Sequence, residues 1–174
     1  MPITTLQPLQ KPNYKLLLNY IIINGFIAGS LDALAAIFIL SHGKAASIFK
    51  FIASGLYGKA AFAGGQNMVI LGLALHYFIA FSFTIFYYII YRYVSILHKN
   101  IFLSAVLYGI FIYVVMNVMV LSLSNVNIPP RHVIGVVKNI VILSVCVALP
   151  AAYFKPAYNS KCKKLSGLSN NLAF

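Results

Sequence analysis

Acidic residues are almost absent from this chain: Asp32 is the only Asp or Glu among 174 residues. A Ser–His–acid set could not form without using Asp32, and the sequence also lacks a glycine-rich phosphate-binding loop. We therefore expect a protein that is not an enzyme.

Charge of either sign is also scarce. Charged residues make up 8% of the chain and hydrophobic residues 61%, and the mean hydropathy is +0.91. A soluble domain has about 25% charged residues, and a disordered segment combines low hydrophobicity with abundant charge. The composition excludes both classes and predicts one membrane-embedded domain in contact with the lipid bilayer.

Cysteine is nearly missing as well. Cys146 lies in an apolar run and Cys162 in a basic tail, so no disulfide framework is expected. A metal site in the membrane region would have to draw on His76, His132 and Asp32, which are too few. We expect no metal and no other cofactor.

Basic residues are the exception, with thirteen Lys and Arg and a net charge of +12. Nucleic-acid binding would need them clustered on one face or along one helix. Here they lie almost entirely between apolar stretches, as in loops retained on the cytoplasmic side of a membrane. The pattern therefore argues against a nucleic-acid partner.

Four segments are long and apolar enough to cross a hydrocarbon core about 30 Å thick, which takes about 20 residues. They are residues 16–40, 68–97, 101–123 and 133–154. The first run is too long for a signal peptide and is expected to be retained. The sequence thus predicts an all-α bundle of four transmembrane helices (16–154), a flexible leader (1–15) and a basic cytoplasmic tail (155–174).

Residues 45–57 form an amphipathic pattern between the first two spans. At helical spacing, Ser47, Lys50 and Ser54 fall on one side, and apolar residues that include Phe49 and Leu56 fall on the other. This pattern predicts an interfacial helix, ended by glycines. The alternative is that residues 45–66 form a fifth span or a re-entrant hairpin.

The basic residues also predict the orientation. Eight of them fall in the leader, the second connection and the tail, whereas Lys44, Lys50, Lys59 and Arg131 lie on the opposite side. Cytoplasmic loops carry the excess of Lys and Arg, so we expect both termini in the cytoplasm.

Each predicted span contributes one polar group at a similar depth. With a rise of about 1.5 Å per residue, Asp32, His76, Asn117 and Lys138 all fall in the outer half of the bilayer. Ionisable side chains in hydrocarbon cost at least about 2.5 to 3.5 kcal/mol without a partner or water. We therefore expect Asp32 to pair with Lys138, with His76 and Asn117 adding hydrogen bonds.

This polar layer has two interpretations. It is an outward-facing site that binds or passes protons or a small solute, with Asp32 as acceptor, Lys138 as counter-charge and His76 as the titrating group. Alternatively, it only locks helix packing in a structural or accessory subunit, or Lys138 extends to the outer interface. Because four helices enclose little room, solute transport is expected to require a homo-oligomer or a larger membrane complex.

Glycines accompany the polar groups. Gly25 and Gly29 form a GxxxG pair before Asp32, Gly72 precedes His76, and Gly109 precedes Asn117. Small residues let helix backbones approach closely, so these four are predicted to be packing positions within the bundle. Dimerisation through GxxxG is the alternative.

The chain resembles the YagU-like family of small bacterial inner-membrane proteins, whose activity is unassigned. The likeness rests on GFIAG at 25–29, on His76 followed by Phe81 and Ser82, and on the region from Gly109 to Pro129 and Pro130. The resemblance implies a four-span protein of the bacterial inner membrane and transfers no catalytic residue.

Overall fold

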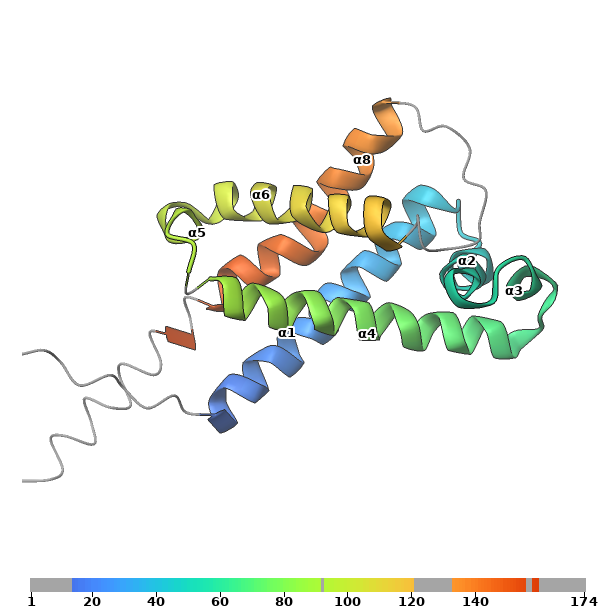
Figure 1. Ribbon diagram of the computed structural model, residues 1–174, viewed down its shortest axis with the longest axis horizontal. Helices are drawn as coiled ribbons and strands as arrows, with labels where there is room; N and C mark the ends of the chain where they lie inside the picture. The colour runs from blue at the N-terminus through green and yellow to red at the C-terminus, as the bar shows by residue number, and fades with distance from the viewer. Residues whose placement is uncertain (1–13, 92, 121–132, 156–157, 160–174) are drawn as a thin grey trace, which may run out of the picture.

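The computed structural model describes residues 14–91, 93–120, 133–155 and 158–159, without the side chains of 118–120. These residues are helical throughout their regular elements and contain no strand, so the predicted all-α class is confirmed (Figure 1). The α-helices are α1 (Tyr14–Ala35), α2 (Ala45–Tyr57), α3 (Ala60–Ala63), α4 (Gln66–Ile90), α5 (Ile96–Lys99), α6 (Ile101–Val114) and α8 (Val133–Leu143). Three π-helical turns, η1 (Ala36–Leu40), η2 (Val115–Val120) and η3 (Ser144–Ala148), follow α1, α6 and α8 directly.

Three helices are long and apolar enough to cross a membrane. They span Tyr14–Leu40, Gln66–Ile90 and Val133–Lys155. Their surfaces expose large apolar side chains that water would not solvate favourably, among them Leu18, Phe26, Ile70, Phe78, Ile134 and Val141. The length and composition of these three helices therefore confirm the prediction of a multi-pass membrane protein.

The predicted span at 101–123 corresponds to a shorter apolar helix, Ile101–Asn117. Its backbone stays helical to Val120 through η2. Residues 121–123 of the prediction lie outside the described residues.

The helix predicted at 68–97 ends earlier, at Ile90. The chain then turns into α5, which buries Leu97 in the same apolar core as Tyr91. The last two turns of the predicted helix are therefore replaced by a turn and a short helix that bury apolar side chains at the end of the bundle. The hydrophobic pattern of the sequence is the same in both cases, so it could not distinguish them.

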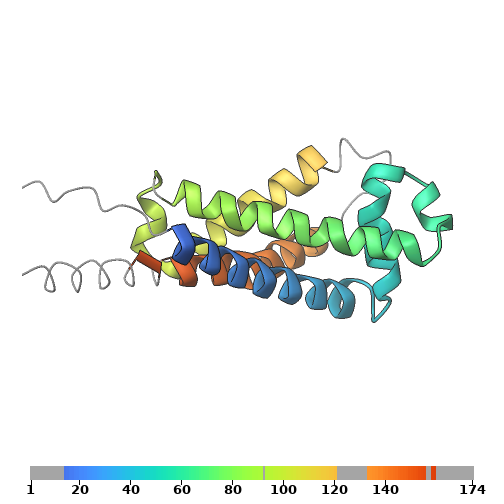
Figure 2. The same ribbon diagram turned by 90° about the horizontal axis from the view of Figure 1, so that it is seen from below.

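The helices form a bundle in which each long helix packs on at least one other. α1 packs on α4, α6 packs on α8 and η3, and α1 also contacts η3. α2 packs on α4 but runs crosswise, at the end where α1 finishes and α4 begins (Figures 1 and 2). The opposite end of the bundle carries α5 and the first residues of α1.

Aromatic side chains join α4 to α6. The Tyr87 and Ser104 hydroxyls are 2.7 Å apart, the Tyr108 hydroxyl donates to the Phe83 carbonyl at 2.6 Å, and Phe86 stacks on Phe111. These contacts link α4 to α6 through their side chains.

α2 has the range predicted for the amphipathic helix, but its buried side is rotated from the predicted one. Ser54, placed on the polar side, is fully buried, and Leu56, placed on the apolar side, is 67% exposed. The Ser54 hydroxyl donates to the Phe51 carbonyl at 2.6 Å, so its own helix satisfies it. α2 ends at Tyr57, and the next residue, Gly58, has a φ of +57° that suits a residue without Cβ.

Pro150 comes just after η3. A proline has no N–H for the carbonyl four residues earlier, and its ring crowds that carbonyl. The π-helical turn at Ser144–Ala148 is where the last membrane helix accommodates this disruption.

Candidate functional site

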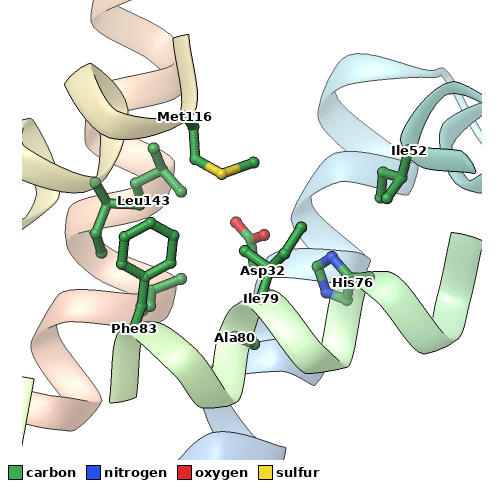
Figure 3. A pocket seen from close by; sticks show the side chains of 10 residues that line it. Asp32, Ile52, His76, Ile79, Ala80, Phe83, Met116 and Leu143 are labelled. Atoms are coloured by element: carbon green, nitrogen blue, oxygen red, sulfur yellow. The ribbon is translucent and has the colours of Figure 1, made fainter. Parts of the chain in front are cut away.

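A small cavity in the bundle contains the only acid of the chain. The Asp32 carboxylate points into it from α1, and His76 lies beside it on α4 (Figure 3). The cavity has a volume of about 60 Å³, which is room for a few water molecules. Asp32 and His76 are the only ionisable residues among the described residues that line it.

The rest of the lining is apolar and comes from α2, α4, α6, η2, α8 and η3. Besides Ala80, it consists of Ile52, Ile79, Phe83, Ile112, Met116, Leu143 and Val147. The Asp32 carboxylate therefore faces hydrocarbon side chains on most sides, a setting that raises the free energy of a bare negative charge. The acid needs a proton, a cation or water in this cavity.

His76 links α4 to α1. Its Nε2 donates to the Gly29 carbonyl at 2.8 Å, and the ring is 8% exposed. The rings of Phe49 and Tyr77 pack against the imidazole edge to face. Because a carbonyl oxygen only accepts, Nε2 carries the proton of this hydrogen bond, and Nδ1 is the other ring nitrogen.

The structure brings together two of the four predicted polar residues. Asn117 and Lys138 are not among the residues that line the cavity. The Asn117 amide donates to the Tyr113 carbonyl of its own helix at 2.7 Å, and Lys138 is exposed on α8. The position of Lys138 favours the alternative in which its side chain extends towards the membrane interface.

Two π-helical turns contribute to the cavity lining, and no sequence pattern located them. Met116 belongs to η2 and Val147 to η3, and η1 begins four residues after Asp32. Such turns are rare and frequently occur at functional sites. The lining residues Met116 and Val147 were missed because apolar residues in an apolar span carry no distinguishing signal.

Two of the four predicted packing glycines lie between α1 and α4. A Cβ at Gly25 would collide with the Phe81 ring, and one at Gly29 would come within 2.9 Å of the Tyr77 ring. Ser30, next to Gly29, places its hydroxyl 2.9 Å from the Tyr77 hydroxyl. The GxxxG pair thus faces a helix of the same chain.

The other two glycines allow closer backbone contacts. A Cβ at Gly72 would collide with the backbone of Phe49 in α2, and one at Gly109 would collide with Ser144 in η3. Gly72 thereby lets α2 lie against α4 one turn from His76. Gly109 lets η3 approach α6 beside the cavity.

Among the residues that the structure describes, three buried polar side chains have atoms without hydrogen-bond partners. They are both amide atoms of Asn24, the Tyr88 hydroxyl and the Ser144 hydroxyl. Asn24 is fully buried, one turn before the core residue Ala28. The interior is therefore less apolar than the composition of the spans suggests.

No family model, curated protein or solved structure matches this chain. The resemblance to the YagU-like family stays a prediction. Within the described residues, no three His, Cys, Asp or Glu side chains are grouped to hold a metal ion.

Proposed function

We propose that the chain is a non-enzymatic, four-span membrane protein in which Asp32 and His76 exchange protons within their shared cavity. The observation that carries this proposal is the placement of the only acid beside a histidine in a cavity with no other ionisable lining residue among those described. Intramembrane ionisable residues usually mark ion or proton pathways.

The size of the cavity favours a proton over a solute. Sites for small molecules have volumes of about 300 Å³ or more, whereas this cavity holds only a few water molecules in about 60 Å³. Imidazole is the side chain that normally changes charge between about pH 5 and pH 8. A proton on Nδ1 of His76 would leave the Nε2 bond to Gly29 intact.

Four crossings fit the helix lengths. The helical stretch from Ile101 to Val120 would extend about 30 Å at about 1.5 Å per residue, which matches the hydrocarbon core. With four spans, both termini lie on the face with more basic residues, the cytoplasmic face of a bacterial inner membrane. The α2 end then faces outward, and Ile52 of α2 lines the cavity, so Asp32 lies in the outer half.

The competing function is structural, and one contact favours it. The hydrogen bond from His76 to Gly29 joins α1 to α4 at a close approach between these helices. In a structural or accessory subunit this bond would fix helix register, and Asp32 would remain protonated. The protein would then hold together a larger membrane complex or a homo-oligomer without moving protons.

Proton flux into liposomes tests the proposal. Purified protein is reconstituted with a pH-sensitive dye inside the vesicles, and a potassium gradient with valinomycin sets the membrane potential. We expect flux above that of protein-free vesicles for the unchanged chain and none above it for Asp32→Asn. Ser82→Ala is the matched control, because Ser82 is on α4 and donates only to the Phe78 carbonyl of its own helix.

His76→Gln separates the two functions. The glutamine amide can still donate to the Gly29 carbonyl but cannot titrate, so a proton site loses flux while the fold keeps its stability. Full flux in Asp32→Asn and His76→Gln would contradict proton exchange. Absence of flux in the unchanged chain, together with a loss of stability in His76→Ala that glutamine restores, would establish the structural function instead.

A further inference from the structure

A second pocket lies where α4, α5 and α6 meet, at the end of the bundle away from α2. Its volume is about 150 Å³. Five aliphatic side chains line it together with Tyr108 and Phe111. The Phe111 ring stacks on those of Tyr108 and Phe86, which makes one wall rigid.

The length of this pocket along α6 matches the hydrocarbon thickness of one leaflet. Ile96 and Leu97 line it from the connection between α4 and α6, and Phe111 lines it about 15 Å along α6 from Ile101, at about 1.5 Å per residue. Half of a hydrocarbon core about 30 Å thick is the same distance. A lipid acyl chain that enters from the interface would therefore run along the pocket.

The interfacial end of the pocket is basic. His98 and Lys99 directly follow the lining residues Ile96 and Leu97 in α5, and both are exposed. The His98 ring packs against Tyr91 with 4.2 Å between centroids, so its position is defined. The chain has no acid other than Asp32 to neutralise these groups.

We propose that this pocket binds one anionic glycerophospholipid, with an acyl chain against Leu107 and Phe111 and the phosphate against Lys99 and His98. Apolar cavities of about 150 Å³ bind apolar groups rather than water. Basic groups beside pockets between membrane helices bind anionic headgroups. The site is separate from the Asp32 cavity and does not depend on proton exchange there.

Native mass spectrometry of the purified full chain, released from detergent micelles, tests this site. Phosphatidylglycerol and phosphatidylcholine with identical acyl chains are added in turn, and the bound lipids are counted. We expect one phosphatidylglycerol to be retained more tightly than phosphatidylcholine. Lys99→Gln should reduce that preference about fivefold, whereas Lys15→Gln, at the same end of the bundle, should leave it unchanged.

Filling the pocket tests the acyl chain. Leu107→Trp should abolish retention of both lipids, and Val106→Trp, on the same helix but outside the lining, should not. Ile96→Trp replaces Leu107→Trp if the latter fails to fold, as judged by size-exclusion chromatography. Asp32→Asn should bind lipid normally, which separates this site from the proton site.

Three results would overturn the proposal. Equal retention of the two lipids would mean that no anionic headgroup is recognised. Unchanged retention in both Leu107→Trp and Ile96→Trp would place the lipid elsewhere on the surface. A dimer that Leu107→Trp disrupts without any change in bound lipid would show that a second copy of the chain occupies the pocket.

Discussion

Asn24 is a buried residue whose side chain is expected to destabilise the folded state. Its amide is fully buried in α1, and neither polar atom has a hydrogen-bond partner. A buried polar group without a partner costs about 1 to 3 kcal/mol. Asp32 could be recognised from the sequence because a charge within a span is unusual. Asn24, two turns earlier in α1, is neutral and was not recognised.

Replacing Asn24 with leucine, which has a similar shape, should raise the free energy of unfolding by about 1 to 3 kcal/mol. Unfolding by SDS in mixed micelles, followed by circular dichroism, measures the change. Asn19→Leu is the control, because Asn19 lies on the same helix with an exposed side chain. A loss of stability in Asn24→Leu would show that the amide has an essential partner.

The residues that meet at the site can be identified by double-mutant cycles. Asp32 and His76 line one cavity, so Asp32→Asn and His76→Gln should show a coupling of about 0.5 to 3 kcal/mol. Lys138 does not line it, so the effects of Asp32→Asn and Lys138→Met should add to within about 0.3 to 0.5 kcal/mol. The same unfolding assay applies, and strong coupling to Lys138 would restore the pairing expected from the sequence.

At the scale of elements, glycine decides how closely α2 and α4 pack. The backbone of Phe49 occupies the space that a side chain at Gly72 would need, and backbone cannot move aside as a flexible side chain can. The predicted range of α2 matched because Gly58 follows the last residue of the helix. Its buried side did not match, because the packing partner, rather than the hydrophobic pattern alone, sets the rotation of a short helix.

Gly72→Ala should therefore lower the free energy of unfolding by about 1 to 3 kcal/mol, the usual cost of overpacking. Gly135→Ala is the control, since open space surrounds that position in α8. There alanine should raise stability by up to about 1 kcal/mol through its higher helix propensity. Equal effects at the two positions, measured by thermal unfolding in detergent, would contradict the close approach of α2 and α4.

For the whole molecule, the arrangement of helices predicts which connections lie on which face of the membrane. α2 lies at one end of the bundle and α5 at the other, so four crossings place Lys44 and Ser95 on opposite faces (Figure 1). The basic residues predict that the α5 end is cytoplasmic. Because the chain has only one acid, the distribution of its Lys and Arg residues is the main determinant of orientation.

Single-cysteine labelling tests this topology in chains with Cys146 and Cys162 replaced by serine. An impermeant maleimide should label Lys44→Cys in intact spheroplasts and Ser95→Cys only after lysis. A chain that retains Cys146 alone measures background, because that thiol lies within a membrane helix. Labelling of both sites from the same side would exclude the single crossing by α4 between them and, with it, the proposed orientation.

The sequence by itself determined that this is a helical membrane protein, because the cost of exposing so many apolar residues to water is independent of how they pack. It also singled out Asp32 and His76, since ionisable groups in hydrocarbon are costly wherever the helix faces. Only the tertiary structure decided that His76, rather than Lys138, lies beside Asp32. Depth along a helix follows from residue count, but the direction of a side chain depends on helix rotation, π-helical turns and close contacts at glycine, which packing between distant segments sets.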